Sequence, residues 1–382
     1  MKRTVSQKPT SHKPASGNLE PEEPRPVKRR AVFDFADRPD IQAFQDAANS
    51  GRRQAMNGFD ADYVDIVDYI VRCTHKIWEE KAIGLIYTHY AHNALVHSSN
   101  GVVYGREAVV RNTLQSQAMT PNLRAYADDV IWGGNETQGF YTSHRVFDTS
   151  THSGYSDIGA PTGRKFQRWV IADCLIVENK IVEEWLAFDA TAGMRQVGLD
   201  PFALARQSTL EGSATTHGEV DRAPGQSAPE FHDVPSPDEP RAFVAAVLHN
   251  LWNARLVNMI RAHYAPGLVS FVPGAQKLYG FGDLENFVIT LMASLPDLAF
   301  NVDHQCVLGN EARGYRVATR FTIRGTHEGF GPYGHPTGRR VFLIGMYHQL
   351  IREGKIAQEW MVFDEFALLK QLYARIGGNG GG

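Results

Sequence analysis

KIVEEWLAFD at residues 180–189 returns as KIAQEWMVFD at residues 355–364, an offset of 175 residues. The two stretches keep Trp, a rare residue, at the same place, as Trp185 and Trp360. A register held over such a distance indicates a duplication, and the period is far longer than that of a solenoid repeat. The sequence therefore predicts two homologous domains in one chain.

The matched register extends upstream through both segments. After residue 100 the offset stays at 175, and the matches include Tyr104-Gly105 with Tyr279-Gly280, Gly134-Asn135-Glu136 with Gly309-Asn310-Glu311, and Pro161-Thr162-Gly163-Arg164 with Pro336-Thr337-Gly338-Arg339. Before residue 100 the offset is 174, and His75, Trp78 and His89-Tyr90 return as His249, Trp252 and His263-Tyr264. One residue has been inserted in the second copy between these blocks.

Hydrophobic periodicity predicts the elements of one copy. Apolar residues at helical spacing over 63–78 predict a long amphipathic helix, followed by a short helical stretch to Tyr90 and a helix after Gly105 that Pro121 ends. Four strands are then expected at about 123–132, 139–149, 164–177 and 181–188, with a last helix from Asp189. Helices followed by a run of antiparallel strands predict an α+β fold in which helices cover one face of a sheet.

The composition places the two copies at 61–206 and 241–377. Residues 1–60 are rich in Pro, carry the basic cluster Lys28-Arg29-Arg30 and contain few large apolar side chains, so a disordered tail is expected there. Residues 207–240 are dominated by Ser, Thr, Gly, Pro and acidic residues and predict a linker. Residues 378–382 predict a flexible tail.

The whole chain has 382 residues, a formal net charge of −3 and three scattered cysteines. A net charge this close to zero gives no general attraction to nucleic acid or to a membrane surface. No apolar run reaches the length of a membrane helix. Three unpaired cysteines indicate neither a disulfide framework nor a structural zinc site. We therefore expect a cytoplasmic protein without nucleic-acid or membrane partners.

The order of elements, the His-x-Gly to Pro-Thr-Gly-Arg stretch and the closing Lys-Ile-x-x-Glu-Trp-x-x-Phe-Asp segment resemble the SnoaL-like polyketide cyclases of the nuclear-transport-factor-2-like superfamily. The resemblance implies two tandem cone-shaped α+β barrels, each with a mostly apolar cavity. It also implies catalysis without metal or organic cofactor, an aldol ring closure in which an Asp transfers protons. In our alignment that Asp falls on Leu186 and Met361, and the supporting His falls on Ala172 and Tyr347. None of these four side chains can serve as a proton donor and acceptor near neutral pH, so the resemblance implies the fold rather than this reaction.

Glu184 and Glu359 are the candidate catalytic carboxylates. Side chains alternate along a strand, so Glu184 shares one face with Leu186 and Phe188, while Trp185 faces the other way. If that face lines the cavity, burial among apolar neighbours raises the pKa of the carboxyl group and makes it a usable acid or base. The alternative is a solvated glutamate at the rim, or one paired with a nearby Arg.

Six further residues stand at duplicated positions, and four of them are candidates for the site. His152 and His327 follow the longest strand, where a His can polarise a carbonyl or transfer a proton, or can instead bond the loop that leads to Pro161 or Pro336. Arg164 and Arg339 can hold a carboxylate or phosphate of a substrate, or can anchor that loop. Asp189 and Asp364 each begin a helix and are expected as N-caps.

The expected ligand is a small hydrophobic molecule bearing a carbonyl group. The side chains expected to line its cavities, apart from the candidates above, are Leu186, Phe188, Tyr347, Met361 and Phe363. His89, His92 and His97 lie close in sequence, but the second copy keeps only the first of them, so no metal site is expected.

Two classes of function remain open from the sequence. The first is a cofactor-free cyclase, isomerase or dehydratase that moves protons on the bound molecule. The second is a non-catalytic binding or dimerisation module, in which the tandem copies form an internal pseudo-dimer and whole chains can also form a homodimer. The position of the two glutamates, inside a cavity or in solvent, discriminates between them.

Overall fold

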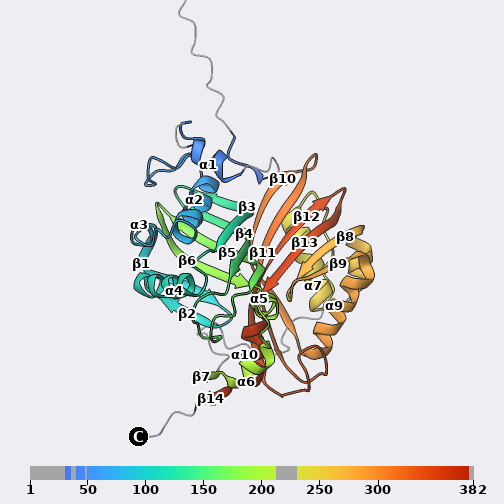
Figure 1. Ribbon diagram of the computed structural model, residues 1–382. Coiled ribbons are helices and arrows are strands. Elements are labelled where there is room, and N and C mark those ends of the chain that lie inside the picture. The colour runs from blue at the N-terminus through green and yellow to red at the C-terminus, as the bar shows by residue number, and fades with distance from the viewer. Residues whose placement is uncertain (1–30, 36–39, 48–49, 212–229, 378–382) are drawn as a thin grey trace, which may run out of the picture. The chain divides into compact units, whose positions relative to one another are not determined.

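The computed structural model describes residues 31–35, 40–47, 50–211 and 230–377, and from Val32 onward these belong to one unit. Each duplicated segment builds one six-stranded sheet (Figure 1). The predicted α+β fold with two tandem copies is therefore confirmed. The basic cluster at residues 28–30, the middle of the predicted linker and the tail at 378–382 lie outside the described residues.

The first copy runs from α2 to α6 and the second from α7 to α10. The elements of the first copy are α2 (Ile66–Trp78), α3 (Leu85–His89), β1 (Tyr90–Ser98), β2 (Gly101–Tyr104), α4 (Arg106–Met119), β3 (Arg124–Asn135), β4 (Gly139–Thr151), β5 (Lys165–Val177), β6 (Lys180–Phe188), α5 (Ala190–Gln196) and α6 (Pro201–Gln207). Those of the second copy are α7 (Pro240–Trp252), α8 (Met259–His263), β8 (Tyr264–Val272), β9 (Gln276–Tyr279), α9 (Gly280–Ser294), β10 (Ala299–Asn310), β11 (Gly314–Thr326), β12 (Arg340–Arg352), β13 (Lys355–Phe363) and α10 (Glu365–Tyr373).

Both sheets have the same strand order. It is β2-β1-β6-β5-β4-β3 in the first copy and β9-β8-β13-β12-β11-β10 in the second. The closing strands β6 and β13 pair antiparallel with β5 and β12, but parallel with β1 and β8. The sheets are therefore mixed, whereas the sequence predicted only the antiparallel run. The strand β1 was not predicted, because His92, Asn93 and His97 interrupt the alternation of its apolar residues.

One face of each sheet is covered by helices. The predicted amphipathic helix is α2, and Asp65 caps it by accepting a hydrogen bond from the backbone N–H of Asp68 at 2.8 Å. Its apolar stripe packs with Val130 and Phe140 of β3 and β4 in one core. In the second copy α7 packs on β10 and β11 in the same way. We call these the helix-covered faces.

The opposite faces of the two sheets pack against one another, and their charged contacts are reciprocal. The guanidinium of Arg145 in β4 lies 3.6 Å from the ring centre of Trp360 in β13. That of Arg320 in β11 lies 3.5 Å from the ring centre of Trp185 in β6. Because both tryptophans lie between the sheets, the expectation that they serve sheet-face packing is confirmed.

Buried polar side chains complete this contact. Arg320 of the second copy lies 3.7 Å from Asp173 of the first copy, which is 4% exposed. His348, the second-copy counterpart of Asp173, shares a hydrogen bond of 2.8 Å with Ser143 of the first copy. The two copies are thus joined by polar side chains that water does not reach, as well as by apolar packing.

Asp189 and Asp364 are N-caps, as predicted, and each also reaches the other copy. Asp189 accepts hydrogen bonds from the backbone N–H groups of Ala192 (3.2 Å), at the start of α5, and of Gly274 (2.9 Å) and Ala275 (2.8 Å), in the β8–β9 turn. Asp364 caps α10 and accepts a bond from the side-chain amide of Asn100 at 2.7 Å, in the β1–β2 turn.

We predict that Asp189→Ala lowers the free energy of unfolding by about 3 kcal/mol, because it removes a cap and leaves two N–H groups of the β8–β9 turn without an acceptor. The control is Asp200→Ala. Asp200 is an exposed cap of α6 whose carboxylate accepts a hydrogen bond from the backbone N–H of Phe202 within the same helix, so its loss is expected to cost about 1 kcal/mol. Urea unfolding at pH 7 measures both, and equal losses would contradict the cross-copy role of Asp189.

The structure differs from the predicted boundaries at two places. Helix α1 (Ile41–Ala47) and residues 50–60 lie within the segment expected to be disordered, yet Phe44, Met56 and Phe59 are buried in the core of the first copy. These aromatic and apolar side chains outweigh the prolines that suggested a tail. Within the predicted linker, β7 (Thr209–Glu211) pairs in parallel with β14 (Arg375–Gly377) at the end of the second copy.

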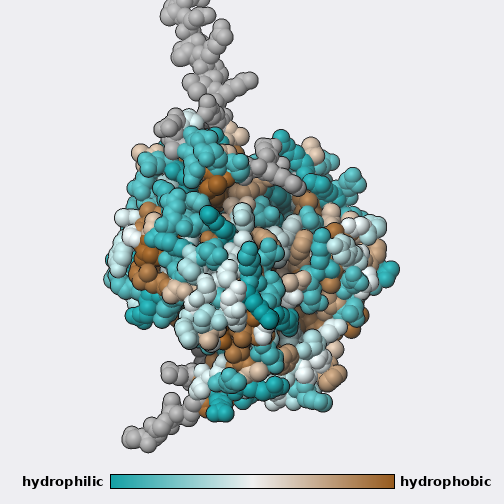
Figure 2. All heavy atoms as spheres, viewed as in Figure 1, coloured by the Kyte–Doolittle hydropathy of each residue, from teal (hydrophilic) through white to brown (hydrophobic). Residues whose placement is uncertain are grey.

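None of the helices in the described ranges is long and apolar enough to cross a membrane. The face shown in Figure 2 is mainly hydrophilic, with small separate apolar patches.

Candidate functional site

Glu184 lies on the helix-covered face of the first copy, as the alternation along β6 predicts. Its neighbours across the sheet are Cys174 of β5 and Val96 of β1, and its carboxylate accepts one hydrogen bond, from the hydroxyl of Tyr90 at 3.0 Å. The side chain is half-buried, so solvent still reaches it. Burial raises the pKa of Glu184 to about 7, against the smaller opposing effect of the Tyr90 hydrogen bond.

Glu359 occupies the matching place in the second copy but has more partners. Its carboxylate accepts hydrogen bonds from the hydroxyl of Ser270 at 2.8 Å, from the side-chain amide of Gln349 at 3.0 Å, and from Tyr264. It is 1% exposed. Burial raises the pKa of Glu359 as well, although these three donors oppose the shift.

The two glutamates therefore differ in their immediate surroundings. The Tyr–Glu pair is duplicated, but Val96 and Cys174 stand where the second copy has Ser270 and Gln349. A buried carboxylate that accepts three hydrogen bonds has the surroundings of a group that stabilises the fold. Glu184 has one hydrogen-bond partner and is partly exposed, so its carboxylate keeps free acceptor positions that solvent can reach.

His152 and His327 bond the loops that follow them. The Nδ1 atom of His152 lies 3.3 Å from the hydroxyl of Thr162, and that of His327 lies 3.2 Å from the hydroxyl of Thr337. Their backbones also bond Arg164 and Arg339 of the same loops. Of the two roles left open by the sequence, the contacts show the loop-holding one; the Nε2 atoms of both are buried without a hydrogen-bond partner among the described residues.

Arg164 and Arg339 contact neither candidate glutamate. Arg339 donates hydrogen bonds to the carbonyl oxygens of Ala374 (2.8 Å) and Gln371 (3.3 Å) at the end of α10. Arg164 is exposed and lies against Gly198 in the turn between α5 and α6. Arg339 thus anchors the last helix of the second copy.

The side chains predicted to line the cavities are more exposed to solvent in the first copy than in the second, as is true of the two glutamates. Leu186 and Phe188 of the first copy are half-buried. Their counterparts Met361 and Phe363 are 1% and 0% exposed, and Tyr347 is 2% exposed. Solvent therefore reaches this lining in the first copy and is excluded from it in the second.

The sequence analysis did not identify His144. It lies on the helix-covered face of β4, directly across from Ala172, and its Nδ1 atom is 3.5 Å from the hydroxyl of Thr74 in α2. Its Nε2 atom is buried without a hydrogen-bond partner among the described residues. Burial lowers the pKa of His144 to about 3, so the ring is neutral at physiological pH and carries one N–H donor.

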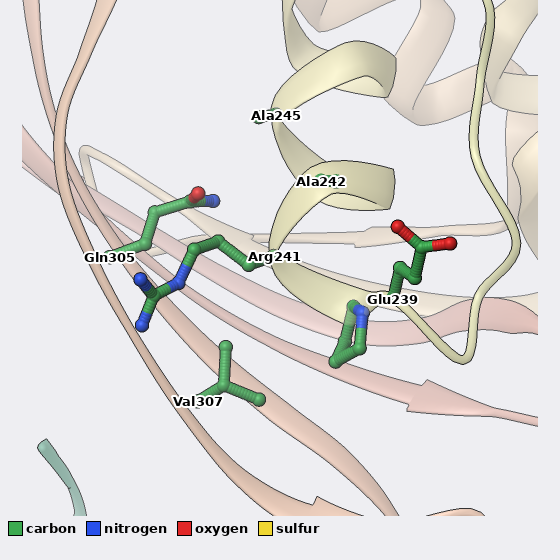
Figure 3. Close-up of a pocket in the computed structure, with 7 residues that line it drawn as sticks. Glu239, Arg241, Ala242, Ala245, Gln305 and Val307 are labelled. Atoms are coloured by element: carbon green, nitrogen blue, oxygen red, sulfur yellow. The ribbon is translucent and has the colours of Figure 1, made fainter.

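A pocket of about 410 Å³ lies elsewhere, between the beginning of α7 and β10. Figure 3 shows Arg241 extending from α7 toward Gln305, with Val307 below them. None of the predicted site residues lines this pocket. We therefore place the candidate site around Glu184, where a shifted carboxyl pKa and partial exposure coincide.

Within the described ranges, no group of three or more His, Cys, Asp or Glu side chains is arranged to hold a metal ion. Cys73 and Cys174, both near Glu184, are buried free thiols.

Each copy is thus an α+β domain in which helices cover one face of a curved six-stranded sheet. Residues 242–372, nearly the whole second copy, match the model of the SnoaL-like polyketide cyclase family, so this copy is similar to the domains of that family. The first copy shares its strand order and pairing register. The resemblance predicted from the sequence is therefore confirmed.

Three solved structures illustrate the similarity. One is a protein of Jannaschia sp. CCS1 described as a candidate SnoaL-like polyketide cyclase (16% identity, 37% of this chain, 98% of that chain, TM-score 0.32). Another is AclR of Streptomyces galilaeus, described as a candidate hydroxylase (25% identity, 35% of this chain, 95% of that chain, TM-score 0.30). The third is IdmH of Streptomyces antibioticus, described as a candidate polyketide cyclase (24% identity, 35% of this chain, 98% of that chain, TM-score 0.30). No curated protein matches the chain significantly.

The pKa of Glu184 predicts a pH-dependent stability. Because folding raises this pKa from 4.5 to about 7, the folded state binds the proton more tightly than the unfolded state, and stability falls as pH rises from about 5 to above 7. Glu184→Gln removes this loss, so its advantage over the wild type is expected to grow by about 2.5 kcal/mol between pH 5 and pH 8.

Urea unfolding at several pH values measures this advantage. Glu328→Gln, a change at an exposed position of the second copy, is the control and should follow the wild-type curve. Parallel curves for Glu184→Gln and the wild type would show that the pKa of Glu184 is not shifted.

Proposed function

We propose that the first copy binds a small hydrophobic molecule with a carbonyl group and catalyses proton transfer on it without a cofactor. The observation that carries this proposal is the carboxyl group of Glu184, which is partly accessible, has one hydrogen-bond partner and has a pKa of about 7. A group with such a pKa is both a competent base and a competent acid near neutral pH. The family match of the second copy supports a small-molecule ligand.

In the proposed step, the carboxylate of Glu184 removes a proton from the carbon next to the carbonyl group. The electron pair of the broken C–H bond moves into the carbonyl to form an enolate. Protonated Glu184 then returns the proton to the same or another carbon, which gives exchange or isomerisation. With an internal carbonyl as electrophile, the enolate carbon instead forms the new C–C bond, and protonated Glu184 gives its proton to the resulting alkoxide, which completes ring closure. His144 lies on the same face, and its Nε2 atom has no hydrogen-bond partner among the described residues, so its neutral imidazole is the group proposed to donate a hydrogen bond to the enolate oxygen.

The proposal gives no proton-transfer step to Glu359, because its three hydrogen bonds and its closure from solvent hold it in place. His152 and His327, predicted to assist catalysis, bond their loops and take no part in the proposed step. Arg164 and Arg339, predicted to bind substrate, instead contact a turn and the last helix. The cytoplasmic location and a homodimer of whole chains remain predictions from the sequence.

Hydrogen exchange tests the reaction directly. The protein is incubated in D₂O with a panel of hydrophobic ketones and esters, and deuterium at the carbon next to the carbonyl is measured by mass spectrometry. Native mass spectrometry of freshly purified protein identifies any ligand that co-purifies. Exchange above the buffer rate on at least one compound supports the proposal.

The alternative is a non-catalytic binding or pseudo-dimeric assembly module. The reciprocal Arg–Trp contacts between the copies favour it, since they show that the sheets form an internal interface. A ligand that binds without any exchange would select this alternative.

A further inference from the structure

The two copies differ in side-chain size at three matched positions on their helix-covered faces. The second copy has Phe300, Phe321 and Tyr347 there, and the first copy has Ala125, Val146 and Ala172. The pairing partners of these positions also correspond, since Tyr347 lies opposite Met361 as Ala172 lies opposite Leu186, and both sheets keep the same register. The three differences therefore fall at the same place in the two folds.

In the second copy the three aromatic rings fill this place. The ring centres of Phe300 and Phe321 are 4.7 Å apart, those of Phe321 and Tyr347 are 5.2 Å apart, and Trp252 stacks on Phe300 at 5.9 Å. All four side chains are at most 3% exposed. The ring of Phe321 lies so close to Gly345 that a Cβ atom there would overlap it. The second copy thus completes its interior with its own side chains.

In the first copy the tryptophan is kept and the other rings are missing. Trp78, the counterpart of Trp252, is half-buried, and so are Ala125 and Ala172. Trp78, Ala125 and Ala172 thus stay partly exposed to solvent, although they lie on the face that helices cover. Glu184 and His144 border the same region, on β6 and β4.

We infer that the chain holds one ligand site, in the first copy, whose size is set by Ala125, Val146 and Ala172. The second copy binds no ligand, because its own aromatic rings occupy the equivalent space. The ligand is apolar over the part that contacts Trp78 and polar where it meets Glu184. This inference rests on the proposed small-molecule site but specifies where it lies, how many sites there are and which residues limit the ligand.

The probe for the test is prodan, a neutral naphthalene ketone whose fluorescence changes in apolar surroundings. Calorimetric and fluorescence titration of the full chain should give one prodan per chain. Ala172→Tyr restores the ring found in the second copy and should weaken binding at least tenfold. Ala125→Phe is a second, independent variant with the same expected effect. Circular dichroism and thermal unfolding confirm that each variant is folded.

The matched control is Phe300→Leu in the second copy. It lowers the thermal midpoint by loosening the aromatic cluster, but prodan affinity should stay within twofold of the wild type. Two prodan molecules per wild-type chain, no binding by the wild type, or undiminished binding by the folded Ala172→Tyr and Ala125→Phe variants would each overturn the inference.

The two proposals fail separately. One bound prodan that Ala172→Tyr displaces, together with hydrogen exchange that Glu184→Gln leaves intact, would overturn the proposed reaction and keep the site. Loss of exchange in Glu184→Gln with prodan bound to both copies would keep the proposed reaction and overturn the inference of a single site.

Discussion

Glu184→Gln is expected to lower the rate of hydrogen exchange on a responsive ketone by about 10²- to 10⁴-fold, the usual contribution of a positioned acid or base. Gln keeps the shape of the side chain and can still bond Tyr90, so the fold should persist. For the wild type, exchange should rise with pH and level off above about 7, because the carboxylate is the base.

The controls separate chemistry from stability. Glu328→Gln, at an exposed position, should exchange at the wild-type rate. The double variant Glu184→Gln with Glu359→Gln should be no slower than Glu184→Gln alone, after correction for the folded fraction. Undiminished exchange in Glu184→Gln would remove this glutamate from the reaction.

Arg320→Ala is expected to lower the free energy of unfolding by about 3–5 kcal/mol. The change leaves Asp173, which is 4% exposed, without its cation, and it removes the guanidinium from the face of Trp185. Removing one partner of a buried pair costs more than removing both. Arg320→Met combined with Asp173→Asn should therefore recover a large part of the loss.

Arg261→Ala is the comparison for a surface pair. The Arg261 side chain is 63% exposed and pairs with Glu285 at 2.7 Å, so its loss is expected to cost at most about 1 kcal/mol. Urea unfolding at pH 7 measures all these variants. An equally small loss for Arg320→Ala would show that the contact between the sheets does not depend on the buried charges.

Duplication made most of the fold predictable. Strands β3 to β6 were predicted within a few residues because both copies repeat their turn residues, and the caps at Asp189 and Asp364 followed from local sequence. The N-terminal contribution to the core was not predicted, because Phe44 and Phe59 are isolated in a segment rich in Pro and gain their partners only in the folded state.

The candidate site was predictable only in part, and for a related reason. Alternation along β6 correctly placed Glu184 and Trp185 on opposite faces. His144 was missed because the comparison of copies selects residues that are repeated, and its counterpart is Thr319. The number of hydrogen bonds around Glu184 and Glu359 depends on Val96, Cys174 and their counterparts on other strands, which a pattern along one strand does not reveal.

The joining of the two sheets within a single polypeptide has an evolutionary consequence. When identical subunits associate, every mutation is present on both sides of the contact, so a residue that plugs one hollow plugs the other. A fused gene escapes this constraint. One half can specialise as a rigid support that presents Arg320 and Trp360 to its neighbour, while the other half stays free to vary the molecule it accommodates.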